Sequence, residues 1–552
     1  MTNRLIQRLD YVLLAMIIAV ITLQPYFMHG SINFFEIGQY LPQINELFYG
    51  KALYRDMFVM RGPLEILMPM SMMALFGKYI GVLNAYFYFG TVLTLIMYAI
   101  FALKIFRTRG FAYLFTLVLV ARTFPWSCYN AWGGIRFGFG ILAILLASIF
   151  LKRRNLFWLF LAGAVSSLAF WTSFEMGAFS FISVAAALCL YGHFETKGIR
   201  GVLKDISVYM TGGLIASLPF LIYLFSQKAF IPYIQTTKVV LTGMTKIFDS
   251  SLCFNTPRNF REFLLALSPF NHNFKYTLPF LFYGCVCVYL WKRFIKNKIS
   301  TADISIILVS IYGLLLYRGA FRDIEGPQYR MALQPLLLVM FFYLERIYGY
   351  AGSTKPSGRI KKALAMLLII TIPLYSVLFS LSKYNKRFFI FKEIRSLVLN
   401  RKRLGISFTE PGPTMLKASR AKGVIVPKLE AEEIDGVVDY ISSRAESRDI
   451  VFTFPDLGVY NFLTDRHPLG RFHTAEFSFM DPAWFREFFS ELENKKPRFV
   501  ICAREYSSIA PFRSKVEGYL DKIDKYLSEN YEVKKSFYTL NVLERKVRYG
   551  KI

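Results

Sequence analysis

Long apolar stretches separated by short polar ones dominate the chain up to residue 382. A helix of roughly 17–25 apolar residues crosses the hydrocarbon core of a bilayer, and we expect about eleven such spans. They lie near residues 10–28, 82–104, 110–126, 135–151, 155–173, 175–191, 206–226, 276–291, 302–318, 330–345 and 362–382. The pattern predicts a mainly α-helical polytopic membrane protein.

Beyond residue 384 the pattern changes to short apolar runs between charged segments. The predicted strands are Val424–Val426, Asp449–Phe454 and Arg498–Cys502, the predicted helices are 429–443, 482–494 and 512–529, and 531–546 is a predicted terminal hairpin. Strands that alternate with helices favour a small α/β domain. We therefore expect a membrane domain over residues 1–384 and an α/β domain over 385–552.

The basic residues are concentrated in short loops between the apolar stretches. The chain has 66 Lys and Arg against 37 Asp and Glu, a formal net charge of +29. Loops of this kind face the cytoplasm, and their alternation along the chain puts the N-terminus there. An odd number of spans then places the α/β domain outside the cytoplasm. We find no nucleic-acid-binding module that would explain the charge instead.

A carboxylate, Glu36, opens the outer segment that follows the first span, residues 29–81. On a helix, Glu36, Tyr40 and Gln43 share one face, and apolar residues share the other. This pattern predicts an interfacial helix that lies on the membrane with a kink at Pro42. Because a charge at a membrane boundary needs water or a polar partner, Glu36 belongs either to a reaction centre or to a solvated surface.

Two more charged residues lie at the outer ends of predicted spans. Arg136 follows two glycines at the start of the fourth span, where it either snorkels to headgroups or binds a phosphate through bidentate contacts. Glu175 lies in a tight turn between the fifth and sixth spans. A carboxylate between two apolar helices is a candidate functional group.

Three arginines, Arg318, Arg322 and Arg330, lie together at another predicted outer boundary. Arginines are disfavoured on the outer side, so their presence requires a partner. A lipid-linked phosphate is one such partner, and the neighbouring carboxylates of Asp323 and Glu325 are the alternative.

The sequence contains no recognisable metal or nucleotide motif. The five histidines form no HExxH or HxH pair, the six cysteines form no CxxC pair, and neither GxSxG nor a P-loop occurs. We therefore assign no cofactor and no metal.

The outer segment contains four short motifs in succession: Glu36-x-Gly38-x-Tyr40, Gly50, Tyr54-Arg55-Asp56 and Gly62-Pro63-Leu64. They resemble the first outer loop of GT-C fold glycosyltransferases, in the branch of the protein mannosyltransferases and the lipid A aminoarabinose transferases. The segment from Arg330 to Pro335 is similar to a late arginine-and-proline segment of that family, and the α/β tail to its periplasmic domain. The family's loop begins with two acidic residues, whereas this chain has Glu36 followed by Ile37.

The resemblance implies an inverting hexosyl- or pentosyltransferase of the plasma (inner) membrane. Such an enzyme moves a sugar from a polyprenyl-phosphate donor to an acceptor hydroxyl on a glycan, lipid or protein of the cell envelope. A transporter or flippase of lipid-linked sugars and a non-catalytic envelope-assembly protein are the alternatives.

The resemblance also implies roles for individual residues. The expected catalytic residues are Glu36, as general base, and Glu175, as a supporting acid or orienting group. The expected ligands of the donor phosphate are Arg322, Arg330 and Arg136. The expected loop-supporting residues are Tyr40, Arg55 and Asp56, with Asp56 paired to Arg55 or Arg61.

Overall fold

A computed structural model describes most of the chain. The described segments are residues 2–22, 32–123, 134–194, 198–247, 260–268, 274–296, 299–320, 327–353, 414–446, 449–506 and 513–546, with a few single residues besides. Arg322, most of the predicted span at 362–382 and the predicted domain boundary at residue 384 lie outside the described residues.

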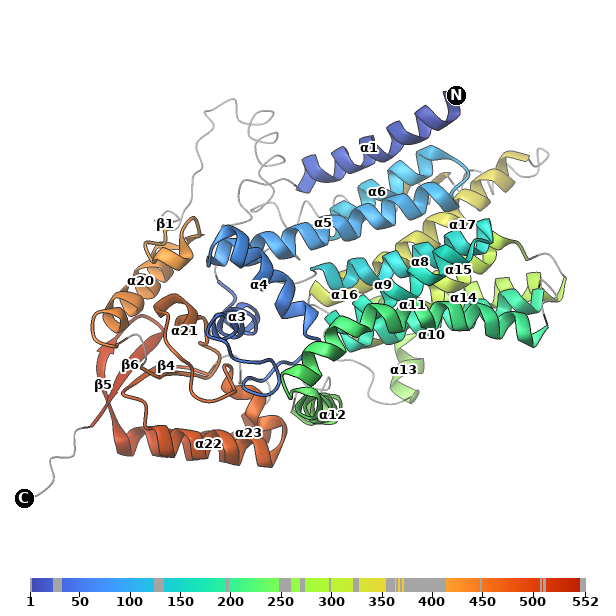
Figure 1. Ribbon diagram of the computed structural model, residues 1–552. Helices are drawn as coiled ribbons and strands as arrows, with labels where there is room; N and C mark the ends of the chain where they lie inside the picture. Colours follow the sequence, from blue (N-terminus) through green and yellow to red (C-terminus); the bar gives the residue numbers. More distant parts are fainter. Residues whose placement is uncertain are drawn as a thin grey trace, which may run out of the picture.

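A bundle of long helices forms the larger part of the molecule (Figure 1). Its helices are α1 (Thr2–Thr22), α5 (Ile80–Ile105), α6 (Arg109–Thr123), α8 (Ile135–Arg153), α9 (Leu156–Thr172), α10 (Phe174–Phe194), α11 (Ile199–Ser226), α14 (Phe274–Ile295), α15 (Thr301–Ala320) and α17 (Gln334–Ser353). The shorter helices among them are α12 (Phe230–Ile247), α13 (Phe260–Ala266) and α16 (Pro327–Ala332).

Within the described residues, seven helices are long and apolar enough to cross a membrane, and three shorter apolar helices accompany them. A helix satisfies its backbone hydrogen bonds internally, which a hydrocarbon environment requires. The prediction of a mainly helical, multi-pass membrane protein is confirmed.

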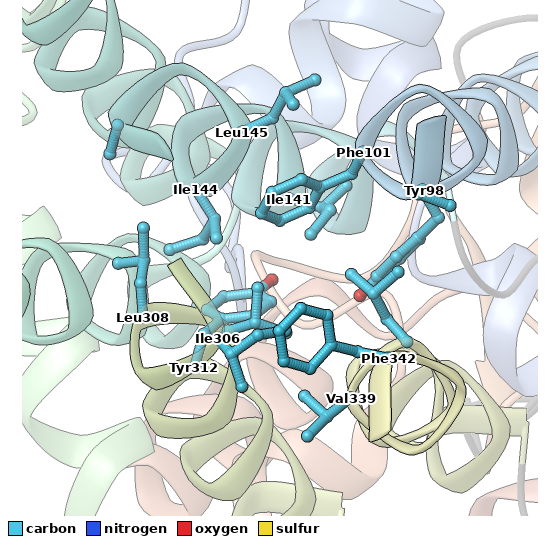
Figure 2. Close-up of a cluster of buried hydrophobic side chains, with 14 of the residues drawn as sticks. Tyr98, Phe101, Ile141, Ile144, Leu145, Ile306, Leu308, Tyr312, Val339 and Phe342 are labelled. Atoms are coloured by element: carbon cyan, nitrogen blue, oxygen red, sulfur yellow. The ribbon is translucent and has the colours of Figure 1, made fainter. Parts of the chain in front are cut away.

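The core of the bundle lies where α5, α8, α15 and α17 meet (Figure 2). The side chains labelled there are Tyr98, Phe101, Ile141, Ile144, Leu145, Ile306, Leu308, Tyr312, Val339 and Phe342. These residues are buried because their helices are apolar on several faces, as helices in the interior of a bundle are.

The C-terminal region is a small α/β unit, as predicted. Its sheet has the order β3-β4-β6-β5, with β3 parallel to β4 and the other pairs antiparallel. The strands are β3 (Val451–Phe454), β4 (Phe499–Ala503), β5 (Tyr531–Ser536) and β6 (Leu540–Arg545), and a separate pair is formed by β1 (Thr414–Met415) and β2 (Ile425–Val426). The helices are α20 (Lys428–Ser442), α21 (Val459–Thr464), α22 (Pro482–Lys495), α23 (Arg513–Asn530) and the 3-10 turns η2 (Ser419–Ala421) and η3 (Ala475–Met480).

The outer segment lies between the bundle and the α/β unit (Figure 1). It forms α2 (Phe34–Gly38), α3 (Leu41–Phe48) and α4 (Leu64–Phe76). The predicted single helix kinked at Pro42 is wrong: Pro42 lies in the first turn of α3, where a missing N–H removes no helical hydrogen bond.

The position of this segment at the membrane surface stays a prediction, but its apolar face contacts protein and not lipid. The apolar face of α2 and α3 packs into the same core as α21 of the α/β unit. The polar residues Glu36, Tyr40 and Gln43 are buried as well. The amphipathic pattern therefore reflects two protein contacts, one apolar and one polar, which a sequence pattern does not distinguish from a contact with lipid.

Candidate active site

Glu36 is held in the first turn of α2. The side chain of Asn33 caps this helix and accepts a hydrogen bond from the Glu36 backbone N–H at 3.1 Å. The Glu36 side chain is 7% exposed. A carboxylate buried to this degree requires charged or hydrogen-bonding groups nearby.

Those groups come from the end of the outer segment, around Glu65 in the first turn of α4. Glu65 is 1% exposed. The Tyr40 hydroxyl donates to its Oε1 at 2.9 Å, and the Tyr86 hydroxyl lies 3.5 Å from its Oε2. Arg61 donates to the Tyr40 hydroxyl, and its Nη1 lies 3.9 Å from Glu65 Oε1.

Arg136 completes this arrangement from the start of α8. Its side chain is buried, and Arg136 and Glu36 both lie within electrostatic range of Tyr40. We call Glu36, Tyr40, Arg61, Glu65 and Arg136 the polar cluster. It combines two carboxylates and two guanidinium groups in a region largely closed to water, where charge interactions are strong.

Arg61 has the most acidic surroundings in this cluster. Burial lowers the pKa of its guanidinium, but Tyr40 and three carboxylates outweigh burial and hold the pKa above its usual range. The carboxylates are those of Glu36, Glu65 and Glu175. Arg61 therefore remains a cation, and Glu175, from a separate turn, faces the same guanidinium as Glu36.

A close backbone contact joins the loop of Arg61 to the start of the helix that carries Glu175. The N–H of Gly62 donates to the carbonyl of Thr172 at 3.1 Å, directly before α10 begins. A Cβ at position 62 would lie 2.0 Å from the carbonyl oxygen of Trp171, so only glycine fits. Glu175 is half-buried in the first turn of α10.

The Tyr54-Arg55-Asp56 motif supports the loop that carries Arg61. Tyr54 has a φ of 67°, and its hydroxyl donates to the Arg61 carbonyl at 2.5 Å. Asp56 forms an ion pair with Arg55 at 2.7 Å and accepts the N–H of Ala52 at 2.8 Å. The hydrogen bond to Arg55 lowers the pKa of Asp56, which keeps it ionised.

The predicted arginines of the late segment are placed elsewhere or are not described. Arg330 lies in α16, which contacts α6, and its nearby charge is that of Arg122 near the end of α6. Arg322 lies outside the described residues. The structure thus brings Glu36, Tyr40, Glu175 and Arg136 within electrostatic range of Arg61, whereas Arg330 interacts with Arg122.

Sequence reasoning missed Glu65 and named Arg61 only as the alternative to Arg55 as the partner of Asp56, which pairs with Arg55. Arg61 and Glu65 are four apart in the sequence, but Arg61 precedes α4 and only Glu65 lies on it. An acid in the first turn of an otherwise apolar helix is a signal that could have identified Glu65.

The α/β unit is fastened to the outer segment by a second polar network. Asp465, at the end of α21, forms an ion pair with Arg420 at 2.7 Å and accepts a hydrogen bond from Tyr49 at 2.6 Å. Arg420 also donates to the Asn45 side chain at 2.8 Å. Nearby, His467 lies 2.8 Å from Glu46 of α3. The C-terminal region is therefore an integral wall of the site.

His473, in the same wall, is a buried neutral imidazole. It is 3% exposed, and neither ring nitrogen has a hydrogen-bond partner among the described residues. Burial lowers its pKa to about 3.

His473→Phe is expected to raise the free energy of unfolding by about 1–3 kcal/mol, because a ring of similar shape removes two unsatisfied polar atoms. Thermal denaturation in detergent checks this.

The same variant should be less sensitive to acid. The pKa of an unfolded histidine, about 6.5, exceeds the folded value of about 3, so the unfolded state binds more protons between these pH values. The contribution of neutral His473 is complete above about pH 6.5 and is lost as the pH falls toward 3. His467→Phe is the control and should destabilise the protein. An equal acid slope in wild type and His473→Phe would contradict this account.

Comparisons with known proteins identify the fold. No protein-family model and no curated protein matches the sequence. The crystal structure of ArnT from Cupriavidus metallidurans bound to undecaprenyl phosphate matches with a TM-score of 0.53, 12% identity, and coverage of 97% of this chain and 98% of ArnT. The apo structure of that ArnT matches with a TM-score of 0.52 at 12% identity, over 98% of each chain. The predicted GT-C fold, that of a lipid A aminoarabinose transferase, is confirmed.

Proposed function

We propose that this protein is a membrane glycosyltransferase that moves a sugar from a polyprenyl-phosphate donor to a hydroxyl of an envelope glycan, lipid or protein. The observation that carries the proposal is the polar cluster, placed at the junction of bundle, outer segment and α/β unit in a chain with the ArnT fold over nearly its whole length. The bound undecaprenyl phosphate in one ArnT structure supports a carrier lipid of the same class.

The proposed reaction uses both charge types in the cluster. Glu36 accepts the proton of the acceptor hydroxyl as its oxygen attacks the anomeric carbon. The bond from that carbon to the phosphate oxygen breaks on the opposite face, so the configuration inverts and the polyprenyl phosphate leaves as an anion. Arg61 and Arg136 stabilise the charge that develops on the phosphate. Glu175 orients Arg61, with which it interacts electrostatically.

The proposed path for the lipid chain begins at α4. Glu65 opens this helix, and its far end carries Leu75 and Phe76, which are 79% and 67% exposed. A helix with a charged site at one end and exposed apolar residues at the other suits a substrate with an anionic head and a long isoprenoid tail. We place this end of the bundle at the outer face of the plasma membrane, with the N-terminus in the cytoplasm, following the distribution of basic loops.

Deletion of the gene tests the proposal in the cell. Mass spectrometry of the envelope glycans and lipids should show one sugar substituent missing in the deletion strain, and a plasmid copy of the wild-type gene should restore it. An unchanged set of envelope glycans and lipids under conditions in which the protein is produced would contradict the proposal.

Arg136→Gln is expected to weaken binding of undecaprenyl phosphate by about 10- to 100-fold. This is the loss expected when one charge-assisted hydrogen bond worth about 1.5–3 kcal/mol is removed. Binding is measured with purified protein in detergent by the lipid-dependent rise in the thermal midpoint. Arg109→Gln, an exposed arginine paired with Asp10, is the control. Unchanged affinity in Arg136→Gln would remove Arg136 from the phosphate site.

A further inference from the structure

A groove of about 540 Å³ runs along α14, a membrane-spanning helix at the periphery of the bundle. Only 22% of this span is buried inside the protein, so most of it faces the bilayer. The groove follows the helix from Phe280 to Lys292, which is about 18 Å at a rise of about 1.5 Å per residue. It is therefore about as long as one leaflet is deep, since the hydrocarbon core is roughly 30 Å thick.

Small residues keep the middle of the groove open. Gly284 and Cys285 line it there, and both are exposed. A Cβ at Gly284 would meet no packing neighbour within 4 Å. The wall continues with the apolar side chain of Val288. A flexible hydrocarbon chain can lie against these residues, whereas a bulky side chain at position 284 would take its place.

Aromatic rings close the outer end of the groove. Phe263 of α13 lies 5.7 Å, ring to ring, from Phe280, which in turn lies 5.1 Å from Tyr317 of α15. The hydroxyl of Thr277 donates to the carbonyl of Ala266 at 2.6 Å and holds α13 against α14. A chain in the groove therefore has its head at the other end, where Lys292 lies.

Two lysines mark that other end. Lys292 lines the groove, and Lys296 follows one helical turn later, on the same side of the helix. Both are exposed, and neither forms an ion pair with a described residue. A buried acid at this end of the bundle, Asp303, is already paired with Arg293 at 3.0 Å and with Arg346 at 2.8 Å. The end of the groove thus carries uncompensated positive charge.

The charged end of the groove is remote from the polar cluster. The pairing of Asp303 places the end of α14 beside the start of α15. There, the hydroxyl of Ser148, near the end of α8, donates to that of Ser305 at 2.8 Å. Arg136 of the polar cluster lies at the start of the same helix α8. Lys292 and the cluster therefore lie at opposite ends of the bundle, and the pattern of basic loops puts Lys292 on the cytoplasmic side.

We propose that the groove binds one acyl chain of an anionic phospholipid of the cytoplasmic leaflet, whose phosphate is held by Lys292 and Lys296. The apolar wall and its length suit the chain, and the closed outer end fixes its direction. Basic residues at the cytoplasmic ends of spans attract anionic headgroups. The inference does not rest on the proposed function, because the donor phosphate is proposed to bind at the opposite end of the bundle.

The headgroup is tested by native mass spectrometry of the purified protein with phosphatidylglycerol or phosphatidylcholine of identical chains. The wild type should bind phosphatidylglycerol about 10- to 30-fold more tightly, and Lys292→Gln with Lys296→Gln should remove this preference while phosphatidylcholine binding stays within about twofold. Arg200→Gln with Lys204→Gln is the control, since it removes two exposed cations one turn apart at the start of α11. Equal binding of both lipids by the wild type, or a full preference in the Lys292 and Lys296 variant, would overturn the proposal.

The groove itself is tested by filling it. Gly284→Phe should weaken binding of both phospholipids about tenfold and leave the affinity for undecaprenyl phosphate unchanged, which also shows that the variant is folded. Gly349→Phe is the matched control, because Gly349 is an exposed glycine of α17 that also lacks a packing neighbour within 4 Å. If Gly284→Phe abolished binding of undecaprenyl phosphate instead, the groove would belong to the donor lipid and the proposal would fail.

Two native cysteines report on the groove without any substitution. Cys285 and Cys287 are both exposed on α14, but of the two only Cys285 lines the groove. Phosphatidylglycerol should slow alkylation of Cys285 by N-ethylmaleimide several-fold and leave the rate at Cys287 unchanged, as measured by peptide mass spectrometry. Equal rates at Cys285 with and without the lipid, or equal slowing at both cysteines, would show that the chain does not lie in the groove.

Discussion

Glu36→Gln is expected to abolish sugar transfer while leaving donor binding intact. A hydroxyl is a weak nucleophile, and a positioned base contributes about 10²- to 10⁴-fold to the rate. The amide has nearly the shape of the carboxylate but cannot accept the proton. We therefore expect kcat to fall by about 10²- to 10⁴-fold, measured with a labelled sugar on a polyprenyl phosphate, while affinity for the bare lipid changes little.

Glu46→Gln is the control for this prediction. Glu46 is a buried acid of the neighbouring helix α3, but it pairs with His467 at 2.8 Å and lies outside the polar cluster. The Glu46→Gln variant should retain sugar transfer. Full activity of Glu36→Gln would remove Glu36 as the base. If Glu65→Gln then lost activity instead, Glu65, the second carboxylate of the cluster, would take that role.

Arg61→Met is expected to cost about 3 kcal/mol of stability, the largest loss we expect from a single substitution in the outer segment. The change removes one of the two cations of the polar cluster from Glu65, which is 1% exposed, and from Glu36. Removal of one partner from a buried charge pair typically costs about 3–5 kcal/mol, because the remaining charge is uncompensated. We take the lower value because the Arg61 side chain is 15% exposed. The shift in the thermal midpoint in detergent measures the loss.

A double-mutant cycle separates this effect from a loss of packing. Glu65→Leu in the Arg61→Met background should recover part of the stability, since the buried carboxylate is then absent. Arg55→Met is the control, because Arg55 is 39% exposed in its pair with Asp56 and exposed pairs contribute about 0–1 kcal/mol. A loss for Arg61→Met no larger than that for Arg55→Met would show that the cluster does not depend on Arg61.

Most of the fold could be predicted because it follows from local patterns. The long apolar helices and the alternation of strands and helices after residue 414 both appear directly in the sequence. The environment of α2 and α3 could not be predicted. Their amphipathic pattern is the same whether the apolar face meets lipid or α21, and only the tertiary contact with the α/β unit decides between them.

The candidate site was predictable only in part. Glu36 and Glu175 were visible as acids at the ends of apolar helices, and the structure places both near one guanidinium. The guanidinium is that of Arg61, and its position depends on the close contact of Gly62 with the Trp171 carbonyl. This contact joins segments more than a hundred residues apart, and no local pattern reveals it. Glu65 likewise gains its role only through Tyr40 and Tyr86.

The structure shows which residues surround Ile37. The resemblance placed a second acid of the family's loop there, but Ile37 is 3% exposed and packs in the apolar core with α21. Two carboxylates nevertheless meet at the site, because Glu65 arrives from α4. The chain thus combines a single acid at the start of the outer segment with a second one at its end.

Transfer by the purified protein tests the central proposal most directly. The protein is incubated with undecaprenyl phosphate carrying a ¹³C-labelled hexose or pentose and with envelope material from the deletion strain. Mass spectrometry and NMR then locate the label. With the wild type, we predict that the label appears on the acceptor with inverted anomeric configuration while bare undecaprenyl phosphate is released. With Glu36→Gln, we predict neither transfer of the label nor release of the bare lipid. The account would be contradicted if the label stayed on the lipid for every sugar tested, with the wild type as well as with Glu36→Gln.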